Sequence, residues 1–223
     1  MKKHLIAVPA FCGAALFLLC GCFSGDNARD DLLNYLEARY TQDDFTFHSY
    51  ELQPEQNELK KTEICVSSKL FPDADLRALR WQKDGKWVYR DNYMAYYLHD
   101  DVEAYMHDIA ESIFGACKVY LDLPWGVYTP ESYPTDADAE YYLKSKPQCG
   151  FAVYLPPGQS KENAAENLKE FTEKLKEKQF FGISGGVRII KEQEAYDEIS
   201  SFDGPAGGFI ENPVCEFIGG FEV

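Results

Sequence analysis

The sequence predicts an α+β fold, in which helices are interspersed with mostly antiparallel strands. Three observations lead to this class. Asp84-Gly85 separates two short alternating runs, which is the strongest local signal for a β-hairpin. Apolar side chains recur at helical spacing from Asn92 onwards, and again after Ser160, a suitable N-cap residue. We therefore expect a helix, an antiparallel meander and a long helix in the first half, and mixed helices and strands in the second.

The first half is predicted to form an N-terminal α+β unit over residues 30–123. Its first helix opens at Asp30 and Asp31, because acidic side chains suit the positive end of a helix dipole. The long helix opens at Asn92 and ends at Gly115, a residue type that commonly stops helices. Its apolar stripe consists of Met94, Leu98, Val102, Tyr105, Ile109 and Ile113. Strands are expected over residues 45–50, 62–70, 76–81, 86–90 and 116–121.

The second half is predicted to form a C-terminal α+β unit over residues 136–223. Residues 124–135, rich in Pro and aromatic side chains, are expected to be a linker or a long ordered loop. The glycines Gly182, Gly185 and Gly186 are expected to interrupt the chain before a strand. The helix after Ser160 buries a narrow face made of Ala164, Leu168, Phe171 and Leu175. The remaining elements are helices over 136–144 and 193–199 and strands over 150–155, 187–191 and 214–223.

The N-terminal segment has the layout of an export signal. Lys2 and Lys3 precede an uncharged apolar run over residues 5–19. The ending Leu19-Cys20-Gly21-Cys22 resembles the lipobox of bacterial lipoproteins, although Ala or Ser is commoner at the place of Cys20. A membrane helix over the same run is the alternative, but the run is shorter than the ~20 residues that span a bilayer.

The lipobox resemblance implies how the protein is exported and anchored. Residues 1–21 would be a signal peptide that is removed, and Cys22 would carry a diacylglyceryl group whose chains include palmitate. Two acyl chains hold a protein stably at a membrane. Residues 22–29 would then tether the body outside the cytoplasm, in the cell envelope.

Three segments of the first half resemble small uncharacterised bacterial envelope lipoproteins. They are Tyr35-Leu-Glu-Ala-Arg-Tyr-Thr-Gln-Asp-Asp-Phe-Thr-Phe, Arg90-Asp-Asn-Tyr-Met-Ala-Tyr and Cys117-Lys-Val-Tyr. The resemblance covers residues 32–121 and implies no activity.

Charge excludes several classes of partner. Without residues 1–21 the chain contains 20 basic and 37 acidic side chains, which gives a net charge near −17. A surface of this sign repels phosphates, so nucleic acid and anionic lipid headgroups are not expected as partners. A cationic peptide, a protein or a glycan remains compatible with it. The sequence gives no indication of oligomeric state.

Four cysteines lie in the body of the protein, namely Cys65, Cys117, Cys149 and Cys215. In an oxidising compartment they permit three disulfide connectivities, of which the local one joins Cys65 to Cys117 and Cys149 to Cys215. Buried free thiols are the equally favoured alternative.

No motif for catalysis, metal or cofactor binding is convincing. Gly182-Ile-Ser-Gly-Gly186 matches the serine nucleophile pattern, but the expected order of helix and strand is reversed. His99, Glu103 and His107 follow at four-residue intervals, and two helical turns are too long for all three to reach one ion. Asp136-Ala-Asp-Ala-Glu140 lacks the later Gly and Glu of a calcium loop. We therefore predict no catalytic residue, no metal ligand and no cofactor.

Six aromatic residues are predicted to gather around the start of the long helix and the loop that follows it. They are Tyr93, Tyr96, Tyr97, Trp125, Tyr128 and Tyr133. Aromatic faces with polar rims bind sugars and peptides, so this group is the candidate ligand site. Packing between the two halves is the alternative, because aromatic side chains usually fill cores.

These observations favour a lipid-anchored, non-enzymatic binding or interaction module of the cell envelope. The first alternative is an envelope hydrolase acting on peptide or glycan. The second is an inhibitor or immunity-type protein that captures a basic partner through its acidic surface.

Overall fold

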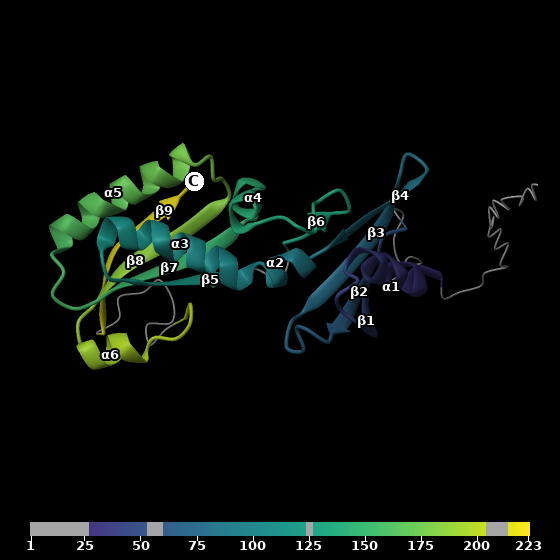
Figure 1. Ribbon diagram of the computed structural model, residues 1–223, viewed down its shortest axis with the longest axis horizontal. Helices are drawn as coiled ribbons and strands as arrows, with labels where there is room; N and C mark the ends of the chain where they lie inside the picture. The colour runs from purple at the N-terminus through teal and green to yellow at the C-terminus, as the bar shows by residue number, and fades with distance from the viewer. Residues whose placement is uncertain (1–26, 53–59, 124–126, 204–213) are drawn as a thin grey trace, which may run out of the picture.

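The computed structural model describes residues 27–52, 60–123, 127–203 and 214–223. Over these residues the chain forms six helices and nine strands, and the strands are arranged in two sheets. This confirms the α+β class. Figure 1 shows the two sheets at opposite ends of the molecule, with α2 between them and α3 lying along the second sheet. The predicted signal peptide, Cys22 and Trp125 lie outside the described residues.

The first sheet is an antiparallel meander with one added edge strand. Its strand order is β1-β2-β3-β4-β6. The strands are β1 (Phe45–Leu52), β2 (Thr62–Ser68), β3 (Leu76–Lys83), β4 (Lys86–Asp91) and β6 (Thr129–Pro130). Asp84 and Gly85 have φ angles of 53° and 76°, so the predicted hairpin turn between β3 and β4 is confirmed.

One face of this sheet is covered by α1 (Asn27–Arg39). The helix buries Leu32 and Leu36, which recur at helical spacing, and Tyr40 follows them into the same core. It begins no later than Asn27, so the last residues of the predicted tether (22–29) are helical. The other face carries Glu63 and Arg77, which alternate with core residues along β2 and β3.

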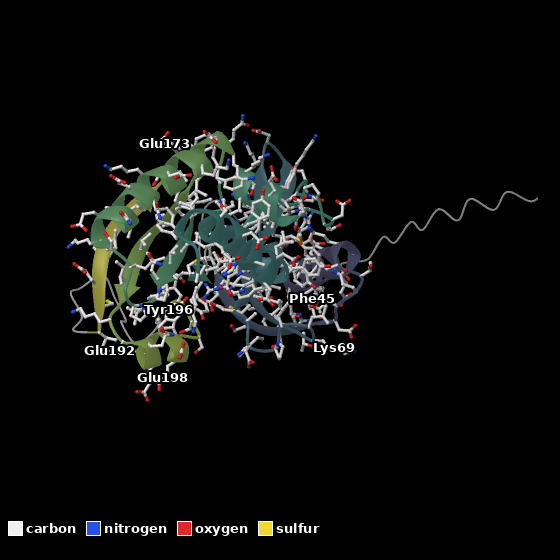
Figure 2. The ribbon with its side chains drawn as sticks, turned by 60° about the vertical axis from the view of Figure 1, so that its left-hand side comes forward. Phe45, Lys69, Glu173, Glu192, Tyr196 and Glu198 are labelled. Atoms are coloured by element: carbon white, nitrogen blue, oxygen red, sulfur yellow. The ribbon has the colours of Figure 1, made fainter. Side chains whose placement is uncertain are left out.

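The second sheet is mixed and has helices on both faces. Its order is β5-β7-β8-β9, and β7 and β8 are parallel. The strands are β5 (Lys118–Asp122), β7 (Cys149–Leu155), β8 (Ile183–Ile190) and β9 (Cys215–Glu222). The helices beside it are α3 (His99–Phe114), α4 (Ala139–Lys144), α5 (Lys161–Glu177) and α6 (Gln193–Glu198). Figure 2 shows Glu173 on α5 and Glu198 on α6 at opposite sides of the molecule, with the sheet between them.

Two local predictions in the second half are confirmed by cap geometry. The Ser160 hydroxyl accepts a hydrogen bond from the backbone N–H of Asn163 and caps α5. Asp138 caps α4 by accepting from the backbone N–H of Tyr141 at 2.8 Å. The acidic run 136–140 therefore serves a helix N-terminus and not a calcium loop.

The predicted division at residues 123/124 is wrong. β5 pairs with β7 of the second sheet, although it falls in the predicted unit 30–123. Thr129–Pro130, inside the predicted linker 124–135, pairs with β4 as an edge strand of the first sheet. The chain therefore passes between the sheets several times. One continuous buried cluster includes residues of both sheets, so the predicted units 30–123 and 136–223 share a core.

The long helix predicted from Asn92 is bent. α2 (Tyr93–Tyr97) and α3 meet at Leu98, whose φ and ψ are −95° and 1°. The predicted stripe is nevertheless buried at Met94, Leu98, Val102 and Ile109. The bend lets one apolar stripe serve two sheets, since α2 packs near the first and α3 covers the second.

The glycine pair Gly185-Gly186 lies inside β8, so the predicted interruption there is wrong. A Cβ on Gly185 would stand 2.2 Å from the carbonyl oxygen of Phe151 and 2.5 Å from the ring of Phe221. Glycine is required at this place because the Phe221 ring crosses the strand. Gly182, with a φ of 76°, does mark the turn before β8.

Candidate ligand-binding site

A buried polar network fixes the end of β4 and the loop after β5. The Asp91 carboxylate, fully buried, accepts hydrogen bonds from the hydroxyls of Tyr35 at 2.6 Å and Tyr40 at 2.8 Å. It also accepts from the backbone N–H of Tyr93 at 3.0 Å. The Arg39 guanidinium, 3.8 Å away, donates to the backbone carbonyl of Tyr133. The network thus ties α1 to both β4 and the loop.

Burial sets the protonation of this network. Loss of water raises the pKa of Asp91, while the two tyrosine hydroxyls and Arg39 act in the opposite direction. Burial and the nearby Asp91 raise the pKa of Tyr35 and of Tyr40, so both remain protonated donors. These groups hold the loop in place, and the Asp91 carboxylate at their centre is closed to solvent.

Two adjoining hollows lie beside this network. The first, here called the junction hollow, has a volume of about 320 Å³ and lies between β4, the loop and the turn after α4. Its lining consists of Arg90, Val127, Tyr128, Thr129, Pro130, Tyr133, Tyr142, Ser145, Lys146, Pro147 and Gln148. The second, the sheet hollow, has a volume of about 370 Å³ and is lined by Lys61, Leu79, Trp81, Arg90 and Tyr128. Arg90 and Tyr128 line both, so the two hollows adjoin each other, and together they are here called the groove.

The charge of the groove is opposite to that of the whole chain. The protein has a net charge of −15, yet neither lining contains an Asp or a Glu. Within the described part of the chain, no carboxylate forms an ion pair with Arg90 or Lys146. Arg90 instead lies over the Trp81 ring at 5.5 Å, and Lys146 over the Phe181 ring at 5.5 Å.

Two tyrosine hydroxyls beside the junction hollow lack hydrogen-bond partners among the described residues. Tyr142 is 1% exposed, and its hydroxyl is buried without a partner. The Tyr133 hydroxyl lies near Ser145 but makes no hydrogen bond of ordinary geometry there, and burial raises the pKa of Tyr133 to about 12. A buried polar group without a partner lowers the free energy of unfolding by about 1–3 kcal/mol. The side of the hollow formed by Tyr133 and Tyr142 is therefore not optimised for stability alone.

Tyr128 is fixed at the centre of the groove. Its hydroxyl donates to the carboxylate of Glu63 on the open face of the first sheet. Glu63 also lies 3.8 Å from Arg77, which pairs with Asp75 at 2.8 Å. The bond fixes the Tyr128 side chain, which lines both hollows, and engages the Glu63 carboxylate outside the two linings.

The thiol of Cys65 lies in the same cluster and donates to Glu51 at 3.2 Å. Burial raises the pKa of Cys65 to about 11, so the group is a thiol at neutral pH and a poor nucleophile. All four cysteines of the described residues are free, so the local disulfides considered from the sequence, Cys65–Cys117 and Cys149–Cys215, are not formed.

The predicted aromatic group is divided by the fold. Tyr128 and Tyr133 line the junction hollow. Tyr93 is 1% exposed and stacks on Tyr40 with centroids 4.0 Å apart, so its prediction as a ligand contact is wrong. Helical periodicity placed it beside the others but gave no indication that Tyr40 and Phe71 would enclose it.

Tyr96 and Tyr97 lie away from both hollows. The Tyr96 hydroxyl is 3.5 Å from the backbone carbonyl oxygen of Asp75, and Tyr97 is 44% exposed and stacks on Tyr93. The sequence reasoning missed Arg90, Tyr142 and Lys146. The Lys146-Pro147 pair was a readable turn signal, but nothing local shows that this turn faces β4.

The candidate metal and serine motifs do not assemble as sites. The carboxylate of Glu103 accepts from the backbone N–H of Leu121 at 2.9 Å and so joins α3 to β5, while His99 contacts Asp100. Ser184 lies within β8 and pairs with Glu222, so it has no nucleophile elbow.

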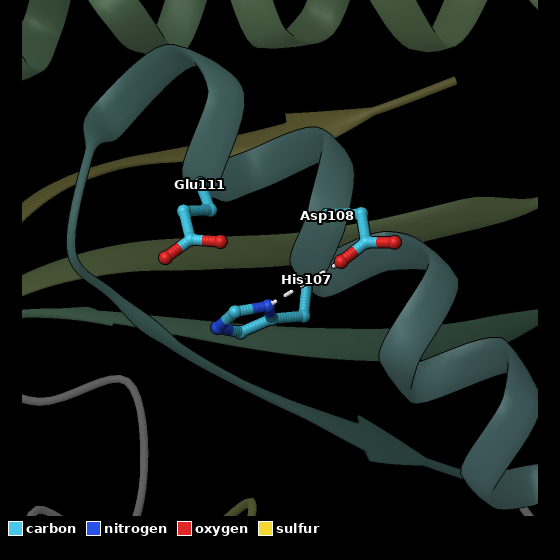
Figure 3. Close-up of side chains that lie close together, drawn as sticks. All are labelled: His107, Asp108 and Glu111. Carbon is cyan, nitrogen blue, oxygen red and sulfur yellow. Dashed lines mark ion pairs between the residues drawn. The ribbon is translucent and has the colours of Figure 1, made fainter.

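A different cluster on α3 brings together His107, Asp108 and Glu111 (Figure 3). One ligand atom from each lies within 4.8 Å of the others, and the His107 Nε2 is 3.2 Å from the carbonyl oxygen of Cys117. The Asp108 side chain is 84% exposed, so a cation there would keep much of its water. The cluster is thus a weak candidate for a metal site.

Within the described residues, no helix has the length and apolar character needed to cross a bilayer.

Comparison with known proteins adds little. No family model matches the chain, and no curated protein matches it. Among solved structures, it is similar to the crystal structure of a DUF5037 family protein from Ruminococcus gnavus ATCC 29149. The two are 14% identical, with a TM-score of 0.33, over 76% of this chain and 77% of that chain. A likeness at this level carries no argument about function.

Proposed function

We propose that the protein is a lipid-anchored binding module of the cell envelope that captures a small ligand in the junction hollow. The observation that carries the binding role is the hollow itself, since aromatic residues, polar residues and two cations that have no carboxylate partner among the described residues line one concave space. The lipobox resemblance of Leu19–Cys22 and the acidic body support the location.

Binding is favoured over hydrolysis because the groove lacks the acids that hydrolysis of glycans requires. Glycoside hydrolysis commonly uses two facing carboxylates, and neither lining includes one. The acids nearest to Tyr128 are engaged by Arg77 and by the Tyr128 hydroxyl. Capture of a basic partner rests on the net charge alone.

The ligand role is tested by filling the hollow. Ser145→Tyr places a ring at an exposed residue of the lining, and Ser132→Tyr adds the same ring to an exposed loop residue outside it. The full chain, solubilised in detergent, is applied to arrays of glycans and peptides. We expect wild type and Ser132→Tyr to retain the same ligands and Ser145→Tyr to lose them. Equal binding by all three, or no ligand for wild type, would overturn the proposal.

The anchor is tested separately by metabolic labelling with palmitate. Cys22→Ala is expected to lose the label. The variant protein is expected either to keep its signal peptide uncleaved or to be released from the membrane fraction. Cys20→Ala is the matched control, because it brings the motif closer to the usual lipobox and is expected to keep the label. Label retained by Cys22→Ala would show that the anchor is not at this thiol.

A further inference from the structure

The charge of the junction hollow points to a narrower class of ligand, and this inference rests on the function proposed above. In a chain with 37 acidic and 22 basic side chains, a cation is expected to find an acidic neighbour. Arg90 and Lys146 line one small space and have no ion pair with a carboxylate in the described ranges. A concave site lined by one sign of charge concentrates ligands of the opposite sign.

The two cations are held by different parts of the fold. Arg90 projects from β4 and is steadied by the Trp81 ring beneath it. Lys146 belongs to the turn after α4, where its φ of 62° and the buried Pro147 fix the backbone. A guanidinium offers two parallel N–H donors that match a carboxylate, and an ammonium adds a second point charge.

The remaining lining suits a sugar ring. Tyr128 and Tyr133 contribute aromatic rings to the lining, and Ser145 and Gln148 contribute exposed polar side chains. The volume of about 320 Å³ lies at the lower end of ligand pockets, which fits one small unit and not an extended chain. We propose that the junction hollow binds one acidic sugar unit, with its carboxylate held by Arg90 and Lys146.

The proposal is tested by titrating the full chain in detergent with glucuronate and galacturonate, using isothermal calorimetry. Glucose and galactose are the matched neutral sugars, and inorganic phosphate and an N-acetylated dipeptide with a free carboxylate are the competing anions. We expect at least one uronate to bind roughly tenfold or more tightly than its neutral counterpart, because a charge-assisted hydrogen bond is lost in the neutral sugar. The same uronate is expected to bind roughly tenfold or more tightly than both other anions, because they lack the sugar ring.

Variants assign the carboxylate to its cations. Arg90→Gln and Lys146→Asn are each expected to weaken uronate binding by roughly tenfold, and Asn tolerates the positive φ at residue 146. Arg90→Lys keeps the charge but loses the paired donors, so an intermediate loss is expected. Lys86→Gln, at the exposed start of the same strand, removes one charge without touching the hollow and should bind as wild type. Circular dichroism melts establish that each variant is folded.

The outcomes separate this inference from the function on which it rests. Equal affinity for neutral and acidic sugars would overturn the carboxylate inference and leave the binding role standing. Tighter binding of the dipeptide or of phosphate would replace the sugar with that anion. Uronate binding that survives both Arg90→Gln and Lys146→Asn would place it elsewhere. If no probe binds and the arrays also give no ligand, both proposals fail.

Discussion

Removal of a single hydroxyl tests the Asp91 network most sharply. In Tyr35→Phe the ring remains, so its stacking on Tyr89 at a centroid distance of 5.0 Å is retained. What is lost is the 2.6 Å hydrogen bond to Asp91, a carboxylate with a fully buried side chain. Hydrogen bonds to charged groups contribute about 1.5–3 kcal/mol, so we expect a loss of that size. For a domain of this length it lowers the Tm by roughly 3–12 °C.

The matched control removes a hydroxyl that donates to a neutral acceptor. The Tyr120 hydroxyl donates to the backbone carbonyl of Ile199 at 2.8 Å, and Tyr120→Phe should cost only about 0.5–1.5 kcal/mol. Urea unfolding followed by circular dichroism at pH 7 gives both values. A loss in Tyr35→Phe no larger than that in Tyr120→Phe would contradict the assignment of Asp91 as a charged acceptor.

The pH dependence gives the sign of the effect. The Tyr35 hydroxyl lowers the pKa of Asp91, although burial raises that pKa above its usual 3.8 overall. Removing the hydroxyl therefore raises the Asp91 pKa further. The penalty of Tyr35→Phe is fully present above the Asp91 pKa of the variant and shrinks as the pH falls from there through the Asp91 pKa of the wild type, because a protonated, neutral Asp91 is a weaker acceptor for the lost hydroxyl. A penalty that stays constant down to pH 4 would refute this reasoning.

Three further predictions concern the framework. Gly185→Ala should lower the free energy of unfolding, measured in urea, by about 3 kcal/mol or more, because the new Cβ overlaps Phe221. Gly220→Ala, whose Cβ would have its nearest atom at 3.3 Å, should lower it by less. Equal losses would contradict the packing argument. Ser160→Ala should lose about 1 kcal/mol and speed amide exchange in the first turn of α5, and Ser160→Asp should restore both. Cys65, with its pKa raised to about 11, should react with iodoacetamide slowly at pH 7, and its rate should still be rising at pH 10; a plateau below pH 9 would show a freer thiol.

Elements with strong local signals were predictable from the sequence. The hairpin at Asp84-Gly85 follows from two residues that accept positive φ, and the start of α5 follows from the Ser160 side chain. The buried stripe of the long helix follows from its periodicity, although the bend at Leu98 does not. Each of these depends on residues within one or two turns of one another, so the sequence specifies them directly.

Strand pairing and burial were decided only by the tertiary structure. β5 has the same alternating pattern whether it pairs with the first sheet or with β7, and two residues at Thr129–Pro130 are too few for any periodicity. Tyr93 and Tyr128 look equivalent in sequence, but one is enclosed by other rings and the other lines the groove.

The candidate site shows the same division between local and long-range information. Its aromatic half, Tyr128 and Tyr133, lies within the predicted linker 124–135, and composition alone drew attention to it. Its cationic half comes from β4 and from the turn after α4, which are 56 residues apart between Arg90 and Lys146. The sequence by itself determined the local elements and the acidic balance of the chain. Only the tertiary structure brought Arg90 and Lys146, which have no carboxylate partner among the described residues, to one hollow, because that depends on contacts between segments with no local influence on each other.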